Sequence, residues 1–222
     1  MSTSETIYKI ERQSLAEQVY NYIKRLILSG DLKGGEKIPE EKVAQQFGVS
    51  RTPIREALRR LEEYGLIKIK PRSFAEVVKL DPQEAEQLAR VRARLETLAV
   101  EVLAECGVEE DFAILEQLAK ECEALLATGD LASTFEKDSQ FHLEIAKRTG
   151  NQHLYEIFEK IDAKMQLLRL VLHLPVKELT QFIGQHEPLV HHMKVHDKEA
   201  AVRLMTKHVL DQLEHFERRE AC

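Results

Sequence analysis

The chain has 222 residues, of which 43% are hydrophobic and 32% are charged, an ordinary balance for a folded globular protein. No apolar run approaches the roughly 20 residues that a membrane helix needs, and the first residues lack the apolar core of a signal peptide. We therefore expect a cytoplasmic protein without a membrane partner. The net charge of −6 excludes a chain that is basic throughout, as many nucleic-acid coating proteins are.

Charge is unevenly distributed along the chain. Residues 1–80 contain 15 Lys and Arg against 11 Asp and Glu, whereas residues 81–222 contain 17 against 27. The first part is thus net +4 and the second net −10. This asymmetry predicts two domains, 1–80 and 81–222, of opposite electrostatic character.

The first eighty residues follow the order of a winged helix-turn-helix. Apolar spacing predicts helices over 14–28, 39–48 and 50–65, and alternation predicts two strands, LIKIK and FAEVVKL, around a PRS turn. Arg51, Arg55 and Arg59 stand four apart, so one face of the third helix carries a row of guanidinium groups. Such a row is often only a solvated helix face, but after a tight turn and before a hairpin it indicates DNA binding.

These residues also carry a family resemblance. The stretch SRTPIREAL and the GLI that follows resemble the DNA-binding domain of GntR-family bacterial transcription regulators. The resemblance implies that Arg51 and Arg55 contact operator DNA, and Thr52, Arg59 and two basic residues of the wing suit phosphates. The wing residues are Lys70 and Arg72. The chain departs from the family at the wing tip, where Phe74 replaces the usual glycine.

Residues 81–222 read as helix throughout. Helices are predicted from Asp81-Pro82 onward with Leu88, Val91, Leu95, Leu98 and Val102 inward, and then over 109–126, 131–149, 152–173, 176–194 and 197–219. Helices joined by short connections favour an antiparallel bundle. The fold class expected for the whole chain is mainly α, a winged helix-turn-helix followed by an all-α bundle.

Nine histidines raise the question of a metal site. The segment HEPLVH is one residue too long for the HExxH spacing of zinc proteases, which excludes that reading. By spacing alone, Asp138 with His142 and His192 with His196 are both candidate pairs, since each stands four apart. The inward stripes of three helices favour the set Asp138, His142, His186 and His208. A buried polar network without metal remains the alternative.

The choice among the histidines comes from a second resemblance. DSQFHLEIAKRTGN is similar to the FCD domain of FadR-type GntR regulators, in its metal-binding, VanR-like form with six helices. The resemblance implies that Asp138, His142, His186 and His208 bind a divalent ion, with zinc as first choice and nickel or manganese as alternatives. It also places Arg92, in VRARLE, where an inward arginine faces the effector.

The two resemblances together imply a homodimeric regulator and not an enzyme. Two reading heads would bind a palindromic double-stranded operator, and a small organic acid at the metal would change operator affinity, with repression as the expected mode. Two alternatives stay open: a metal-dependent hydrolase with a DNA-binding head, and a regulator whose C-terminal bundle only dimerises.

Overall fold

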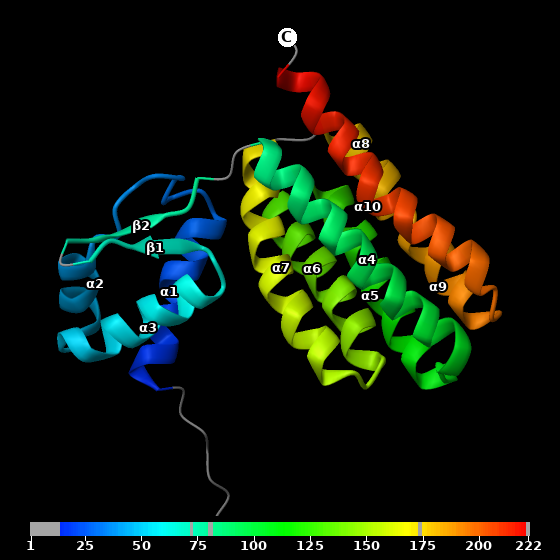
Figure 1. Ribbon diagram of the computed structural model, residues 1–222, viewed down its shortest axis with the longest axis horizontal. Helices are drawn as coiled ribbons and strands as arrows, with labels where there is room; N and C mark the ends of the chain where they lie inside the picture. Colours follow the sequence, from blue (N-terminus) through cyan, green and yellow to red (C-terminus); the bar gives the residue numbers. More distant parts are fainter. Residues whose placement is uncertain (1–13, 72, 80–81, 173–174, 221–222) are drawn as a thin grey trace, which may run out of the picture.

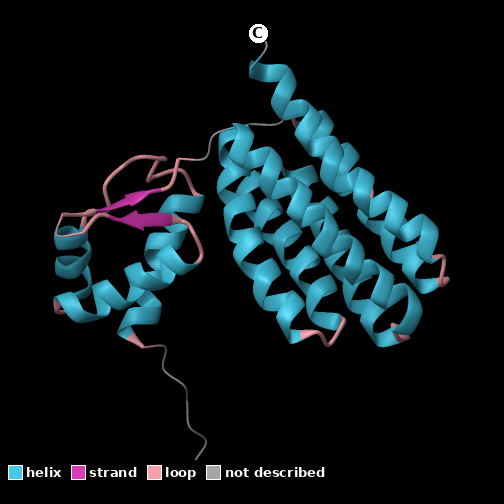
Figure 2. Cartoon of the chain, viewed as in Figure 1, coloured by secondary structure: helices cyan, strands magenta, loops and turns pink. Residues whose placement is uncertain are grey.

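The computed structural model describes residues 14–71, 73–79, 82–172 and 175–220, and it is almost entirely helical (Figure 2). Three helices and one hairpin form the N-terminal part. Its elements are α1 (Leu15–Leu28), α2 (Glu40–Phe47), α3 (Arg51–Glu63), β1 (Ile67–Ile69) and β2 (Ala75–Val77). The strands pair antiparallel with Ile67 opposite Val77 and Ile69 opposite Ala75. The predicted winged helix-turn-helix is confirmed.

Local signals explain where these helices begin and end. The Ser14 hydroxyl accepts a hydrogen bond of 3.1 Å from the Glu17 backbone N–H, which caps α1 as expected. Gly48 ends α2 with a φ of +62°, a left-handed conformation that glycine adopts without a Cβ penalty. The chain therefore turns sharply, and α3 begins three residues later.

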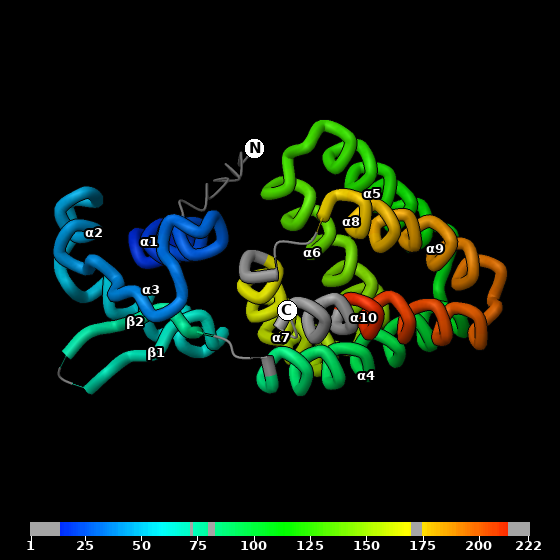
Figure 3. Tube along the Cα trace, turned by 90° about the horizontal axis from the view of Figure 1, so that it is seen from above, coloured from blue at the N-terminus to red at the C-terminus, as the bar shows by residue number. Residues whose placement is uncertain are grey.

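The N-terminal core extends into the second part of the chain. Buried aliphatic side chains of α1 and α3 pack together, including Val19, Ile23, Ile27, Ile54, Leu58 and Leu61. Ala163 and Leu167, which belong to α7, are members of the same cluster. The two parts therefore share apolar surface, and α7 is the bundle helix that lies against the N-terminal part (Figure 3).

The C-terminal part is a layered helical bundle, seen from the side in Figure 1. Its elements are α4 (Pro82–Cys106), α5 (Glu109–Thr128), α6 (Leu131–Arg148), α7 (Gln152–Leu172), α8 (Val176–Ile183), α9 (His186–Lys194) and α10 (Lys198–Glu220). No helix in the described part of the chain is long and apolar enough to cross a bilayer. The domain boundary expected at 80/81 lies outside the described residues.

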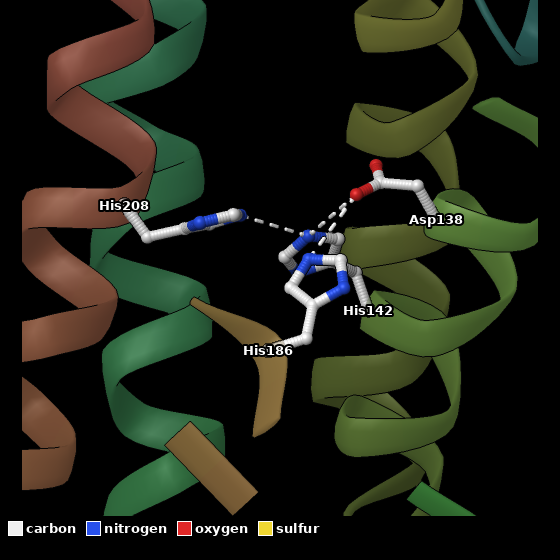
Figure 4. A group of neighbouring side chains, drawn as sticks. All are labelled: Asp138, His142, His186 and His208. Carbon is white, nitrogen blue, oxygen red and sulfur yellow. Dashed lines mark hydrogen bonds and ion pairs between the residues drawn. The ribbon is translucent and has the colours of Figure 1, made fainter. Parts of the chain in front are cut away.

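The segment predicted as one helix over 176–194 is two helices. α8 stops at Gly184, and Gln185 separates it from α9. Glycine is about 1 kcal/mol worse than alanine inside a helix, so the chain can break there at little cost. The break sets His186 at the start of a new helix, where its ring points into the bundle (Figure 4).

The inward face of α4 was predicted wrongly in part, since Leu88 and Leu95 do pack against the core. Val91 and Leu98 are 48% and 43% exposed, and Leu88, Leu95 and Val102 are only partly buried. The buried face instead carries small residues and two charged ones. It includes Ala85, Ala89, Arg92, Ala93, Glu96, Ala99, Val100 and Leu103. Alanines allow close helix packing, so the most hydrophobic stripe was not the buried one.

Candidate metal centre and DNA-binding face

Four potential ligands converge inside the bundle. Asp138 and His142 come from α6, His186 begins α9, and His208 lies on α10 (Figure 4). All four are buried, and each offers one ligand atom within 4.8 Å of the others. The structure thus brings together the set that the FCD resemblance implied, whereas the half-buried His192 on α9 and the exposed His196 beyond its end are not part of it.

The converging atoms are three imidazole Nε2 atoms and one carboxylate oxygen. Asp138 Oδ1 lies 3.2 Å from His186 Nε2 and 3.6 Å from His142 Nε2. His142 Nε2 and His208 Nε2 are 3.2 Å apart. Among the described residues, neither ring nitrogen of His186 has a hydrogen-bond partner of good geometry. A cation is the partner that would satisfy all these atoms at once.

The outer ring nitrogens are held by acceptors. His142 Nδ1 lies 2.5 Å from Glu96 Oε2, and His208 Nδ1 lies 3.1 Å from Gln185 Oε1. An Nδ1–H that donates to each acceptor leaves the lone pair of each Nε2 facing the centre. Two facing lone pairs repel unless a proton or a metal ion lies between them, so this arrangement fits an ion. Nitrogen and carboxylate ligands in this ratio suit zinc, nickel and manganese.

Burial and neighbouring charges favour the metal-binding protonation state of Asp138, His186 and His208, and the opposite state of His142. Burial opposes ionisation of Asp138, but Arg169, which forms an ion pair with Asp138 Oδ2, outweighs it and holds the pKa of Asp138 well below its usual value. Burial lowers the pKa of His186 and, together with the neighbouring rings, lowers that of His208 strongly. For His142 burial acts in the same direction, but Glu96 prevails and raises its pKa.

Arg92 is fully buried on α4, a helix that packs against α6, which carries the ligands Asp138 and His142. Its Nε donates to Glu96 Oε1, and Glu96 also accepts from His142, so the arginine connects to the ligand set through one carboxylate. The Nη1 and Nη2 groups of Arg92 have no partner among the described residues. A guanidinium with two open donors suits the carboxylate of a ligand.

The predicted DNA-contacting residues of α3 lie on one exposed face. Arg51, Thr52, Arg55 and Arg59 are all exposed, and the only ion pair found for Arg51 in the described part of the chain is a 4.0 Å surface contact with Glu41. Together with α2 and the wing, α3 borders a groove of about 860 Å³ that Arg51, Arg55, Arg59 and Lys70 help to line. The arginine row therefore faces open space.

The wing tip accommodates Phe74 without backbone strain. His196 is the only non-glycine residue with positive φ in the described chain, so Phe74 does not need the conformation that glycine supplies. The Lys37 ammonium instead lies over the Phe74 ring in a cation–π contact, 4.0 Å from the ring centroid. Lys70 is exposed and pairs with Glu76 at 2.9 Å. Arg72 lies outside the described residues.

Several polar residues around the centre were missed from the sequence. They are Glu96, Asp162, Gln166, Arg169 and Gln185. A signal was present for three of them: Asp162, Gln166 and Arg169 stand four and three apart on α7, which makes a polar stripe among apolar residues. Glu96 likewise stands four residues after Arg92.

Comparisons with known proteins agree with this architecture. A model of the FCD domain matches residues 87–211, and one described as bacterial regulatory proteins, gntR family, matches residues 15–77. The HTH-type transcriptional regulator YdhC of Bacillus subtilis (strain 168) is 30% identical over 200 residues, which cover 90% of this chain and 89% of YdhC. The chain is a GntR-family transcriptional regulator with an FCD domain.

Two further relatives agree with this assignment. The gluconate operon transcriptional repressor of Bacillus licheniformis is 26% identical over 199 residues, or 87% of this chain and 82% of that protein. The solved structure of Escherichia coli McbR/YncC matches with a TM-score of 0.81 and 26% identity, over 94% of this chain and all of that one. These relatives are transcriptional regulators, and the resemblances to the GntR DNA-binding domain and to the FCD domain are confirmed at that level.

Proposed function

We propose that this GntR regulator is a repressor whose affinity for operator DNA is controlled by a small organic acid bound at a divalent metal ion. The convergence of Asp138, His142, His186 and His208 within 4.8 Å carries the proposal. The Bacillus licheniformis relative is the gluconate operon transcriptional repressor, which supports both repression and an acid signal. A protein of this kind would act in the cytoplasm, where bacterial DNA lies.

DNA binding is assigned to the exposed face of α3. Arg51 and Arg55 would fork onto base edges or phosphates, while Thr52, Arg59 and Lys70 would contact the backbone. Arg72 of the wing belongs to the same prediction but lies outside the described residues. The N-terminal charge of +4 favours approach to DNA from this side of the molecule.

In the FCD domain, Asp138, His142, His186 and His208 would hold zinc, nickel or manganese. When bound, the ion would supply positive charge and open coordination positions that accept a carboxylate. Glu96 and Gln185 fix the tautomers of two ligands, and Arg169 keeps Asp138 ionised. Arg92 offers its two open Nη groups to an acid bound beside the ligands.

Helix α7 is the physical connection from this centre to the DNA-binding part. Arg169 on α7 pairs with the ligand Asp138, and ten residues earlier Glu159 accepts a 2.8 Å hydrogen bond from the Tyr64 hydroxyl. Ala163 and Leu167, between them, pack in the N-terminal core. A shift of α7 when acid binds would therefore reposition α3. The acid must bind the two positions of α7 with different affinity for this to occur.

A homodimer is proposed because two reading heads match a palindromic operator. The exposed Val91 and Leu98 support it, since they stand seven residues apart on α4 and form an apolar stripe at the surface. The stripe lies on the face opposite the buried Arg92–Glu96 pair, so dimerisation there would leave the metal centre inside each protomer.

The test is an operator-binding titration in two states of the protein. Operator selected from random DNA by the wild-type protein is titrated, by fluorescence anisotropy, with zinc-loaded and EDTA-stripped dimer, each with and without a panel of small carboxylic acids. The proposal predicts that at least one acid weakens binding at least fivefold, and only in the zinc-loaded state. Acid effects that are equal in both states would remove the metal from the mechanism. No acid effect at all would leave the bundle as a dimerisation domain alone.

A further inference from the structure

Asp162 is a buried carboxylate with one unused oxygen. It lies on α7 and is 1% exposed. Its Oδ2 accepts from the Ser139 hydroxyl and, at 2.7 Å, from Gln166 Nε2. Its Oδ1 is buried and has no partner among the described residues. A buried acceptor without a donor lowers stability, so the fold tolerates a penalty at this atom.

Two hydrogen-bonded neighbours connect Asp162 to the helix segments that carry the candidate metal centre. Ser139, which binds Asp162, directly follows the ligand Asp138 on α6. Gln166 contacts both Ser139 and Asp162, and one turn further along α7 Arg169 pairs with Asp138. Burial opposes the charged form of Arg92. The carboxylates of Glu96, Asp138 and Asp162, in decreasing order of effect, outweigh burial and raise the pKa of Arg92. Asp162 and Arg92 therefore border the same polar interior.

The open groups on the two residues are complementary in kind. Arg92 has two N–H-bearing nitrogens without partners, and Asp162 has one acceptor oxygen without a partner. A simple carboxylate would satisfy Arg92 but would place negative charge beside Asp162 with nothing to donate to it. A ligand that also carries an O–H or N–H group would satisfy both residues.

A purely structural role explains Asp162 less well. If its task were only to accept from Ser139 and Gln166, one oxygen would suffice, and a neutral Asn or Gln would avoid the cost of burying a charge. An ionised carboxylate is the stronger acceptor for a hydroxyl or an ammonium group. The unused Oδ1 is therefore the informative atom.

We propose that Asp162 is a specificity-determining residue that accepts a hydrogen bond from the effector, and that the effector is a small hydroxy or amino carboxylic acid. This inference rests on the proposed function, because it assumes that an acid binds at the metal centre. The metal and Arg92 require only a carboxylate on the effector, whereas Asp162 also requires a hydrogen-bond donor.

The first experiment compares matched acids on the zinc-loaded full-length protein. Parent, 2-hydroxy and 2-amino acids of equal carbon skeleton, from propionate, lactate and alanine to succinate, malate and aspartate, with gluconate added, are titrated by isothermal calorimetry. At least one hydroxy or amino acid should bind about 10–100-fold tighter than its parent, the ratio expected for a hydrogen bond to a charged group. Comparison of the hydroxy acids with the amino acids identifies whether a hydroxyl or an ammonium group donates to Asp162.

The second experiment uses a matched pair of variants on α7. Asp162→Asn removes the charge but keeps the shape, and Glu156→Gln makes the same change at an exposed position of the same helix. The ratio between substituted and parent acid should fall to within about threefold in Asp162→Asn and stay at the wild-type value in Glu156→Gln. Binding of the parent acid should persist in both, which a general loss of structure would not allow.

The outcomes separate this inference from the proposed function. Equal binding of parent and substituted acids by the wild-type protein, or an unchanged ratio in Asp162→Asn, would overturn the role of Asp162 and leave the acid-sensing function intact. Binding of no acid from any arm would overturn both. If Asp162→Asn fails to fold, the wild-type ratios alone decide.

Discussion

At the scale of single residues, substitution of Arg51 tests DNA recognition without disturbing the fold. Its side chain is 80% exposed, and its one ion pair with a described residue is a 4.0 Å contact with Glu41, which contributes little to stability. We predict that Arg51→Ala weakens operator binding about 10–100-fold per site while the melting temperature stays the same. Anisotropy titrations and thermal scans measure the two quantities.

The control for this change is Arg203→Ala. Arg203 is also exposed and pairs with one glutamate, Glu199, at 3.3 Å, but it lies on α10 in the C-terminal part. It should leave operator affinity unchanged. Full retention of specific binding by Arg51→Ala would overturn the assignment of α3 as the reading helix.

His208 provides the corresponding test inside the bundle. It is 1% exposed, and its Nε2 lies 3.2 Å from that of His142. His208→Ala should lower zinc affinity at least about 100-fold, because loss of a direct ligand costs more than loss of the outer partners, which is worth 10–100-fold. Competition titration with a zinc indicator measures the change, and the exposed His153 on α7 supplies the control variant, His153→Ala. Equal loss in both variants would count against a localised site.

Residue-level prediction from the sequence succeeded where a local rule applies. The Ser14 cap and the Gly48 turn follow from short-range chemistry. The ligand set needed the family resemblance, because His192 and His196 satisfy the same helical spacing as Asp138 and His142. Asp162 and Glu96 were missed because a buried acid in a helix cannot be told from a solvated one until its neighbours from other helices are placed.

At the scale of elements, the hairpin was predicted from the sequence and the buried face of α4 was not. Alternation and turn residues were enough to predict the hairpin, since its register is local. The buried face of α4 was not predictable in the same way, because its alanines contribute less hydrophobicity than the exposed Val91 and Leu98. The helices that a face can pack against, and not hydrophobicity alone, decide which face of α4 is buried, and the exposed apolar stripe is the surface proposed for the dimer.

The contact between Tyr64 and α7 gives a prediction at this scale. Tyr64→Phe removes the 2.8 Å hydrogen bond to Glu159 and should lower the free energy of unfolding by about 1 kcal/mol. More specifically, the factor by which acid changes operator affinity should move towards one, while acid affinity itself changes little. Operator titrations with and without acid measure this factor.

Tyr22→Phe is the matched control for this contact. The Tyr22 hydroxyl donates a 2.9 Å hydrogen bond to Gln46, entirely within the N-terminal part. Its loss should leave the acid response at the wild-type factor. An unchanged response in Tyr64→Phe as well would mean that the signal reaches α3 by a route other than this contact.

At the scale of the whole molecule, each protomer of the proposed dimer has a basic N-terminal part and an acidic C-terminal part. A basic part of net +4 and an acidic part of net −10 orient each protomer with its reading head towards DNA. Leu98→Glu should disrupt association through α4 and reduce operator affinity by about 10²–10⁴-fold through lost avidity. Light scattering after size exclusion gives the mass. Ile157→Glu, at a 52% exposed position on α7, should remain dimeric.

The metal content of the purified protein tests whether the four converging side chains bind an ion. The full-length protein is stripped with EDTA, reloaded with zinc, desalted and analysed for zinc per chain alongside its melting temperature. The arrangement of Asp138, His142, His186 and His208 predicts one ion per chain, and a melting temperature about 5–15 °C higher than in EDTA. Absence of stoichiometric zinc, with the same melting temperature in EDTA, would show that these four side chains do not form a metal site.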